Sequence, residues 1–154
     1  LGMRIIHIFV RYIPGFASIL MYLTRMMYQK PSILRNAIDK VSEPDKKVFD
    51  NAQQFNSFLN TGNESFRQGL GGAAQEFKIV VSPWGFDLNL IRCSVSIWYG
   101  QFDHQVPFAH AQIYEKLISN AKLYYLENEG HLSVLYNHIN DIFDTITNRS
   151  NLSR

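Results

Sequence analysis

Two polar residues, Asp103 and His131, have the types and the surroundings of an acid–base pair. Asp103 follows a β-forming run at 95–99 and the turn glycine Gly100. His131 follows a second β-forming run, at 121–126, and a turn of polar residues closed by a glycine. A carboxylate that accepts from one imidazole nitrogen fixes the tautomer of the ring and leaves the other nitrogen as a general base. The two residue types therefore suit a hydrolytic site.

The segment between the two residues is long enough to bring them together. Apolar residues at helical spacing predict a helix over 108–119, with Pro107 at its start. A helix of about a dozen residues travels roughly 18 Å, and a strand of about six residues returns roughly 20 Å. In a right-handed strand–helix–strand unit, both turns then lie at the carboxyl edge of two parallel strands, where α/β sheets place their sites. We therefore expect Asp103 and His131 to meet.

The order of these elements resembles the last third of an α/β-hydrolase. The residues that carry the resemblance are the G-x-x-D of 100–103, the Val-Pro pair of 106–107 and the Gly-His pair of 130–131. Residues 82–100 also resemble the entry into the acid strand of small-molecule hydrolases in this superfamily. Residues 1–80, including the helix start at 64–72, are similar to their helical caps. The resemblance implies an α/β fold class: two parallel strands with flanking helices, preceded by a helical cap.

The nucleophile of that family is missing from the sequence. The family carries its serine on a G-x-S-x-G elbow that precedes the acid and the histidine. Six serines precede Asp103 and none has the flanking glycines; they are Ser18, Ser32, Ser42, Ser57, Ser65 and Ser82. Ser18, three residues after Gly15, is the nearest imitation. The resemblance thus implies a hydrolase of an ester, amide or similar small-molecule bond. This chain would supply only Asp103 and His131 of its triad, so that the chain alone is expected to be inactive.

A non-catalytic binding module or fragment is the alternative interpretation. The sequence pattern indicates only two strands. A two-stranded sheet with open edges has marginal stability and tends to pair with other strands. Both interpretations predict that the strand at 95–99 needs a neighbour, supplied by a missing N-terminal half or by a second copy in a homo-oligomer.

Other polar residues offer weaker sites. His104 and His110 are expected on the surface or at a helix start, and His138 on an exposed helix face. Glu127 and Glu129 could compete with Asp103, but they belong to the histidine's own turn. No ligand spacing for a metal is present, and no cofactor is expected.

Composition narrows the class of partner and the compartment. A net charge of +2, with no basic stripe, gives no reason to expect a nucleic-acid partner, and a small-molecule substrate is favoured. The single cysteine, Cys93, excludes an internal disulfide and favours a reducing cytoplasm; its place before a strand predicts a buried thiol. The apolar start of the chain is interrupted by charges and by Pro14. Its uncharged run of about 13 residues is shorter than the ~20 that a membrane span needs, which leaves an interfacial anchor as the other reading.

The chain divides into three parts. Residues 1–81 are expected to form a helical cap, 82–147 the C-terminal part of the hydrolase core, and 148–154 a frayed tail. Within the cap, helical spacing predicts helices over 3–12, 15–29, 32–40, about 45–59 and 63–80. The aromatic and methionine side chains of the first 28 residues either hold these helices together or line an apolar substrate pocket.

Overall fold

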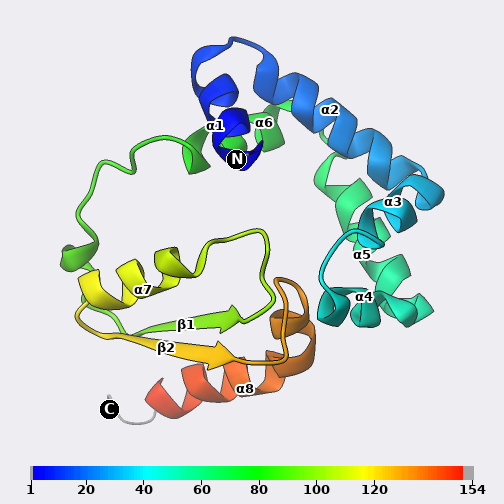
Figure 1. The fold of residues 1–154 in the computed structure, drawn as a ribbon. Helices are drawn as coiled ribbons and strands as arrows, with labels where there is room; N and C mark the ends of the chain where they lie inside the picture. The colour runs from blue at the N-terminus through cyan, green and yellow to red at the C-terminus, as the bar shows by residue number, and fades with distance from the viewer. Residues whose placement is uncertain (1, 151–154) are drawn as a thin grey trace. The chain divides into compact units, whose positions relative to one another are not determined.

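The computed structural model describes residues 2–150, and within them the protein is a mixed α/β chain with eight α-helices and one two-stranded parallel sheet (Figure 1). In chain order the elements are α1 (Gly2–Tyr12), α2 (Phe16–Gln29), α3 (Pro31–Ile38), α4 (Glu43–Asp50), α5 (Ala52–Ser65), α6 (Gly71–Val80), the short 3₁₀ helix η1 (Leu88–Leu90), β1 (Val95–Gly100), α7 (Phe108–Leu117), β2 (Ala121–Leu126) and α8 (Ser133–Ser150). The expected tail begins inside α8, whose backbone runs to Ser150; residues 151–154 lie outside the described part.

The chain forms two compact units. The first combines residues 1–37 with 52–85, and the second combines residues 38–51 with 86–154. The segment 38–51, which carries α4, thus belongs with the sheet, although its sequence pattern groups it with the helical half. Each unit is described separately below.

The first unit is helical, and its core lies where α1, α2 and α6 meet. Val10, Ala17 and Ala74 are buried there, with larger apolar side chains packed around them. Gly15, at φ 81°, separates α1 from α2 in a conformation that favours glycine, so the predicted pair of helices at 3–12 and 15–29 is confirmed. α2 also packs on α5, where the ring of Tyr28 occupies the space that a Cβ on Gly62 would need.

Two helices predicted within residues 1–81 have other boundaries in the structure. The helix expected over 45–59 is broken at Asn51, whose backbone is extended, and the second piece continues through the polar residues 60–63 to Ser65. The helix expected over 63–80 begins only at Gly71, because Gly69 turns the chain at φ 98°. A glycine costs about 1 kcal/mol in a helix interior, and here the chain turns at that glycine and starts the helix after it.

The second unit is built on the parallel pair β1 and β2, as the sequence predicts. The strands are in register from Val95 opposite Ala121 to Gly100 opposite Leu126. Helix α7 connects them and lies on one face of the sheet, while α8 lies on the other face (Figure 1). α4 packs on α8, with the rings of Phe49 and Tyr136 in edge-to-face contact at 5.9 Å.

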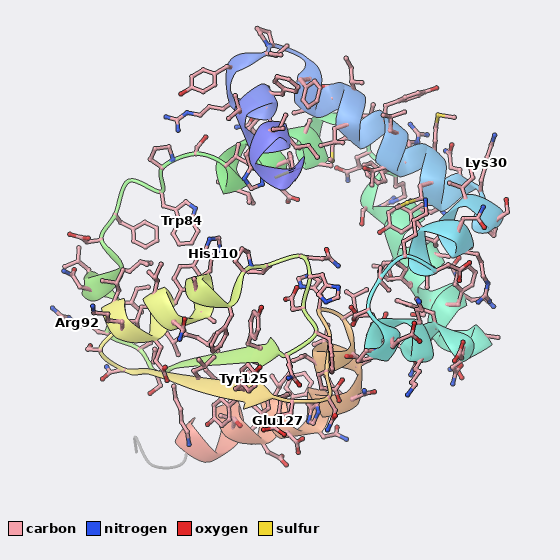
Figure 2. The ribbon with its side chains drawn as sticks, in the orientation of Figure 1. Lys30, Trp84, Arg92, His110, Tyr125 and Glu127 are labelled. Carbon is pink, nitrogen blue, oxygen red and sulfur yellow. The ribbon has the colours of Figure 1, made fainter. Side chains whose placement is uncertain are left out.

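Aromatic side chains fill both faces of this small sheet because alternate strand residues point to opposite sides. Trp98 stacks on Tyr124 at 4.4 Å between ring centroids. On the face that α7 covers, Tyr99, Tyr125 and Phe108 form a second cluster, with Tyr125 at the strand surface (Figure 2). Each such pair contributes about 0.5–1.5 kcal/mol beyond its buried area, so these rings stabilise the two-stranded sheet in addition to its backbone hydrogen bonds.

The sheet ends at both strands: within residues 2–150, neither β1 nor β2 pairs with a third strand. Among the helices of the same part, none has the length and the apolar character needed to cross a bilayer.

Candidate functional site

Gly100 and Gly130 bring the two loops of the candidate site together. A Cβ atom on Gly100 would collide with the carbonyl groups of Glu129 and Gly130, so only glycine fits at the end of β1. Hydrogen bonds cross between the loops at this point: the N–H of Phe102 donates to the carbonyl of Glu129 at 2.8 Å. The turn after β1 and the turn after β2 therefore lie directly against each other.

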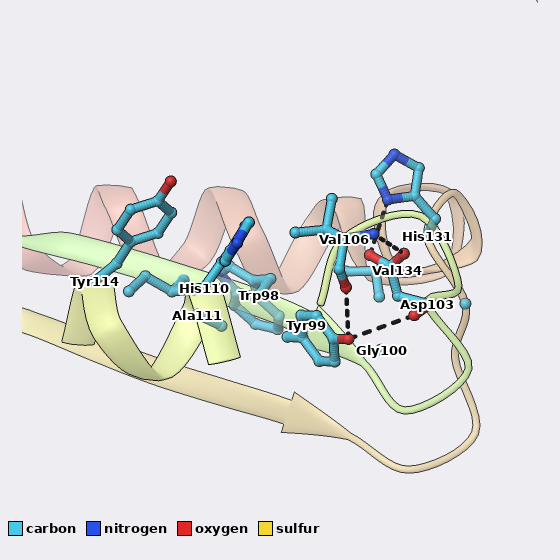
Figure 3. Close-up of a pocket in the computed structure, with 12 residues that line it drawn as sticks. Trp98, Tyr99, Gly100, Asp103, Val106, His110, Ala111, Tyr114, His131 and Val134 are labelled. Carbon is cyan, nitrogen blue, oxygen red and sulfur yellow. Dashed lines mark hydrogen bonds and ion pairs between the residues drawn. The ribbon is translucent and has the colours of Figure 1, made fainter. Parts of the chain in front are cut away.

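Asp103 and His131 meet at this edge of the sheet. Nδ1 of His131 lies 2.9 Å from Oδ2 of Asp103 (Figure 3). The Asp103 side chain is almost buried, with 7% of its surface exposed, while the His131 ring is 34% exposed. An ionised carboxylate only accepts hydrogen bonds, so the geometry favours the tautomer with the proton on Nδ1 and a bare Nε2. Nε2 points away from the carboxylate (Figure 3). The geometric expectation that these residues meet is confirmed.

The Asp103 carboxylate is held by its own turn. Its Oδ1 accepts the backbone N–H groups of Gln105 and Val106 at 2.7 and 2.9 Å, which leaves Oδ2 for the histidine. The hydroxyl of Tyr99 donates to the carbonyl of Val106 at 2.8 Å and closes the loop from below. Burial, together with the nearby charge of Asp103, raises the pKa of Tyr99, so this hydroxyl stays a donor. The orientation of the Asp103 carboxylate is thus fixed by bonds that do not involve His131.

A pocket of about 210 Å³ extends from the pair along β1. Its lining comes from both faces of the sheet: Tyr99 and Ala111 lie on the α7 side, and Trp98 and Val134 on the α8 side (Figure 3). The pocket, called the groove below, runs beside β1 and ends at His131. Trp98 belongs to the strand that borders the groove, and its buried Nε1 has no hydrogen-bond partner among the described residues.

The remaining histidines lie outside the pair. His104 is exposed in the acid turn, as expected, and His110, on the first turns of α7, borders the groove. His138 was expected on an exposed face, but its side chain is only 26% exposed and lies between two carboxylates. Its Nδ1 is 3.0 Å from Asp141 and its Nε2 is 3.1 Å from Glu129. The bond with Asp141 and that with Glu129 raise the pKa of His138, against the effect of burial.

Glu129 and Glu127 do not compete for His131. Glu129 is buried and turned toward α8, where it binds His138 and Asn137, and Glu127 is exposed. In the described part of the chain, no three His, Cys, Asp or Glu side chains gather as metal ligands would. Cys93 is exposed, so the expectation of a buried thiol is wrong; the chain at 91–94 is still a loop and has not yet entered the sheet.

Among the side chains that the structure describes, the His131 ring forms a hydrogen bond with the carboxylate of Asp103 and with no serine hydroxyl. Ser133, two residues later, is fully buried and its hydroxyl accepts the N–H of Gly130. Ser18 lies early in α2 and follows a helix, whereas a nucleophile elbow follows a strand.

Sequence reasoning missed one residue of this site. Asp45, in the first turn of α4, is buried, and its carboxylate accepts the backbone N–H groups at the start of α8. The only local signal was the spacing Ser42-x-x-Asp45, which is typical of a helix start and says nothing of a partner 86 residues away.

Comparison with known proteins adds no identification, because the chain matches no protein-family model, no curated protein and no solved structure. What the site can do has to be argued from its own geometry.

Proposed function

We propose that this chain is the cap and C-terminal part of a serine hydrolase of the α/β-hydrolase type, which cleaves an ester, amide or similar bond in a small molecule. The observation that carries the proposal is the 2.9 Å contact between Asp103 and His131 at the carboxyl edge of two parallel strands. The buried carboxylate and the half-buried ring have the polarity that general-base catalysis requires.

The proposed roles are those of an acid, a base and a nucleophile, and the geometry supports the first two. His131 Nε2 takes the proton of a serine hydroxyl as the serine oxygen bonds to the carbonyl carbon of the substrate. The same proton then passes to the leaving alcohol or amine as its bond to that carbon breaks, which leaves the serine acylated. Water repeats the sequence and releases the acid. Asp103 stays ionised throughout and stabilises the imidazolium that forms between the two transfers. The serine and its oxyanion hole belong to polypeptide that is not part of this sequence.

The compartment proposed for this hydrolase is the cytoplasm. An exposed free thiol such as Cys93 persists best in a reducing environment.

The experiment compares this chain with a longer polypeptide that adds a strand and a G-x-S-x-G elbow before residue 1, using a series of p-nitrophenyl esters. The 154-residue chain should show no turnover above background. The longer polypeptide should turn over, and His131→Ala and Asp103→Asn should each lower its kcat about 10³- to 10⁴-fold. If the 154-residue chain turns over the ester and His131→Ala abolishes that turnover, the claim that the nucleophile is missing is wrong. If the folded longer polypeptide turns over the ester equally well with His131→Ala, the proposed catalytic role of Asp103 and His131 is wrong.

A second candidate function is strand binding without catalysis. The groove along β1 and the unpaired edge favour it, since an extended segment can add to an open sheet edge through main-chain hydrogen bonds. The same edge would receive a missing N-terminal half or a second copy of the chain. The ester assay separates the two functions: a polypeptide that completes the sheet and still lacks His131-dependent turnover favours the binding module.

A further inference from the structure

Asp45 is a buried carboxylate whose two oxygens accept hydrogen bonds from four donors. Only 2% of its surface is exposed. Its Oδ1 accepts the N–H groups of Leu132 and Ser133, each at 2.8 Å. Its Oδ2 accepts the N–H of His131 at 3.1 Å and the hydroxyl of Ser42 at 2.8 Å. A buried carboxylate is tolerated when its oxygen atoms accept hydrogen bonds from enough donors, and here four donors bond to them.

Three of these donors belong to the turn that carries His131. They are the N–H groups of His131 and Leu132, in the turn that enters α8, and of Ser133, the first residue of α8. The positive end of the helix dipole favours a carboxylate at this place. A helix N-terminus is usually capped by a side chain of its own segment. Here the cap comes from α4, more than 80 residues earlier in the chain.

Gly130 leaves the room that this arrangement needs. A Cβ atom on Gly130 would collide with the Ser42 hydroxyl and with the Asp45 carboxylate. The glycine of the Gly-His pair is therefore required by the approach of Asp45.

We infer that Asp45 is a positioning residue for His131. The inference rests on the proposed function, in which His131 is the base. Two carboxylates hold this histidine from opposite ends: Asp45 holds its backbone N–H, and Asp103 holds its ring. With the backbone anchored, the Cα and Cβ atoms of His131 stay where one rotamer brings Nδ1 to Asp103, and the bond to Asp103 then fixes the direction of Nε2.

A merely structural role for Asp45 would join α4 to α8 and leave the ring's bond unaffected. The variant that separates the two roles is Asp45→Asn. The amide keeps one oxygen for Leu132 and Ser133, and its NH₂ can donate to the Ser42 hydroxyl, but it faces the N–H of His131 with a donor in place of an acceptor. Ser42→Ala is the matched control, because it removes a bond to the same oxygen and leaves the bond from His131.

The measurement is ¹H–¹⁵N NMR of the histidine rings in the full chain, with His131→Gln to assign the signal. In the wild type, the Nδ1–H of His131 should be visible and slow to exchange. Because a hydrogen bond to a charged group contributes about 1.5–3 kcal/mol, Asp45→Asn should speed this exchange about tenfold or more. Ser42→Ala should stay within about twofold of the wild type on the same scale, since its lost bond is not on the histidine turn. The amides of β1 and β2 report whether each variant is folded.

Unchanged exchange of the His131 ring in a folded Asp45→Asn variant would overturn the inference. Where that variant fails to fold, the wild type decides: the backbone amide of His131 has Asp45 as its acceptor, so it should be protected from deuterium exchange, and an unprotected amide overturns the inference. Failure of the proposed function looks different: the longer polypeptide then shows no His131-dependent turnover of esters, whereas the effect of Asp45→Asn on the His131 ring signal remains.

In the longer polypeptide with the serine elbow, Asp45→Asn should lower kcat for p-nitrophenyl esters and leave KM close to that of the wild type, since Asp45 acts through His131 and does not touch the substrate. A lower affinity with unchanged kcat contradicts the positioning role.

Discussion

Gly100 lies against the carbonyl group of Gly130, and no side chain fits between the two. This contact joins the loop that carries the acid to the loop that carries the histidine, and it explains why β1 ends in a glycine.

Gly100→Ala should therefore destabilise the protein and separate the pair. The added methyl group meets backbone atoms, which cannot rotate away, so the cost should be about 3 kcal/mol or more in the free energy of unfolding, at the upper end for overpacking. Chemical denaturation measures it. Gly72→Ala is the control, since nothing lies within 4 Å of a Cβ there, and a helical alanine should leave stability unchanged or raise it. Equal effects of the two changes would contradict the close contact.

His138 should make stability depend on pH. Its bonds with Asp141 and Glu129 raise its pKa in the folded protein above the ordinary value of 6.5. A raised folded pKa means that the protonated ring stabilises the fold: the contribution is complete below about pH 6.5 and is lost as the pH rises through the folded pKa.

The check is the free energy of unfolding from pH 5.5 to 8.5 in the wild type and in His138→Gln. The difference should be about 1 kcal/mol or less at the acid end, because Asp141 is mostly exposed and its charge is screened, and it should shrink above the folded pKa. His104→Gln, on an exposed turn, should follow the wild-type curve. A difference that grows with pH would mean that the neutral ring is the stabilising form.

The open edge of β1 should make the isolated chain associate. Alternate residues of a parallel strand bond to the same neighbour. Val95 and Gln101 donate toward the β2 side, so the N–H groups of Ser96 and Trp98 face the open edge. Static light scattering should give a mass that rises above the monomer with concentration.

Ser96→Pro removes an outward N–H and should leave a monomer with an intact sheet, whereas Ile97→Pro, one residue on, removes an inward bond and should unfold the sheet. A wild-type chain that stays monomeric at the highest concentration would contradict the claim that the open edge of β1 drives association.

The meeting of Asp103 and His131 was predictable because it depends on lengths: a helix and a strand of matched reach bring two strand-end turns to one edge. The strands and α7 were predictable for another reason: the apolar pattern of each element lies within its own short segment. The role of Asp45 was not, because a carboxylate in a helix's first turn usually caps its own helix, and nothing local shows that it turns to α8. The break at Asn51 follows the division between the two units, since α4 packs with the sheet and α5 with the helices. The pairing of His138 with Glu129 likewise depends on how α8 lies on the sheet.

The most direct test of the central claim is the tautomer of His131, read from its two ring nitrogens by ¹⁵N NMR of the full chain near neutral pH. The account predicts a protonated Nδ1, a bare Nε2 and a slowly exchanging Nδ1–H signal that disappears in Asp103→Ala. A ring that averages between tautomers like free histidine, and that is unaffected by Asp103→Ala, would contradict the claim that Asp103 prepares His131 as a base.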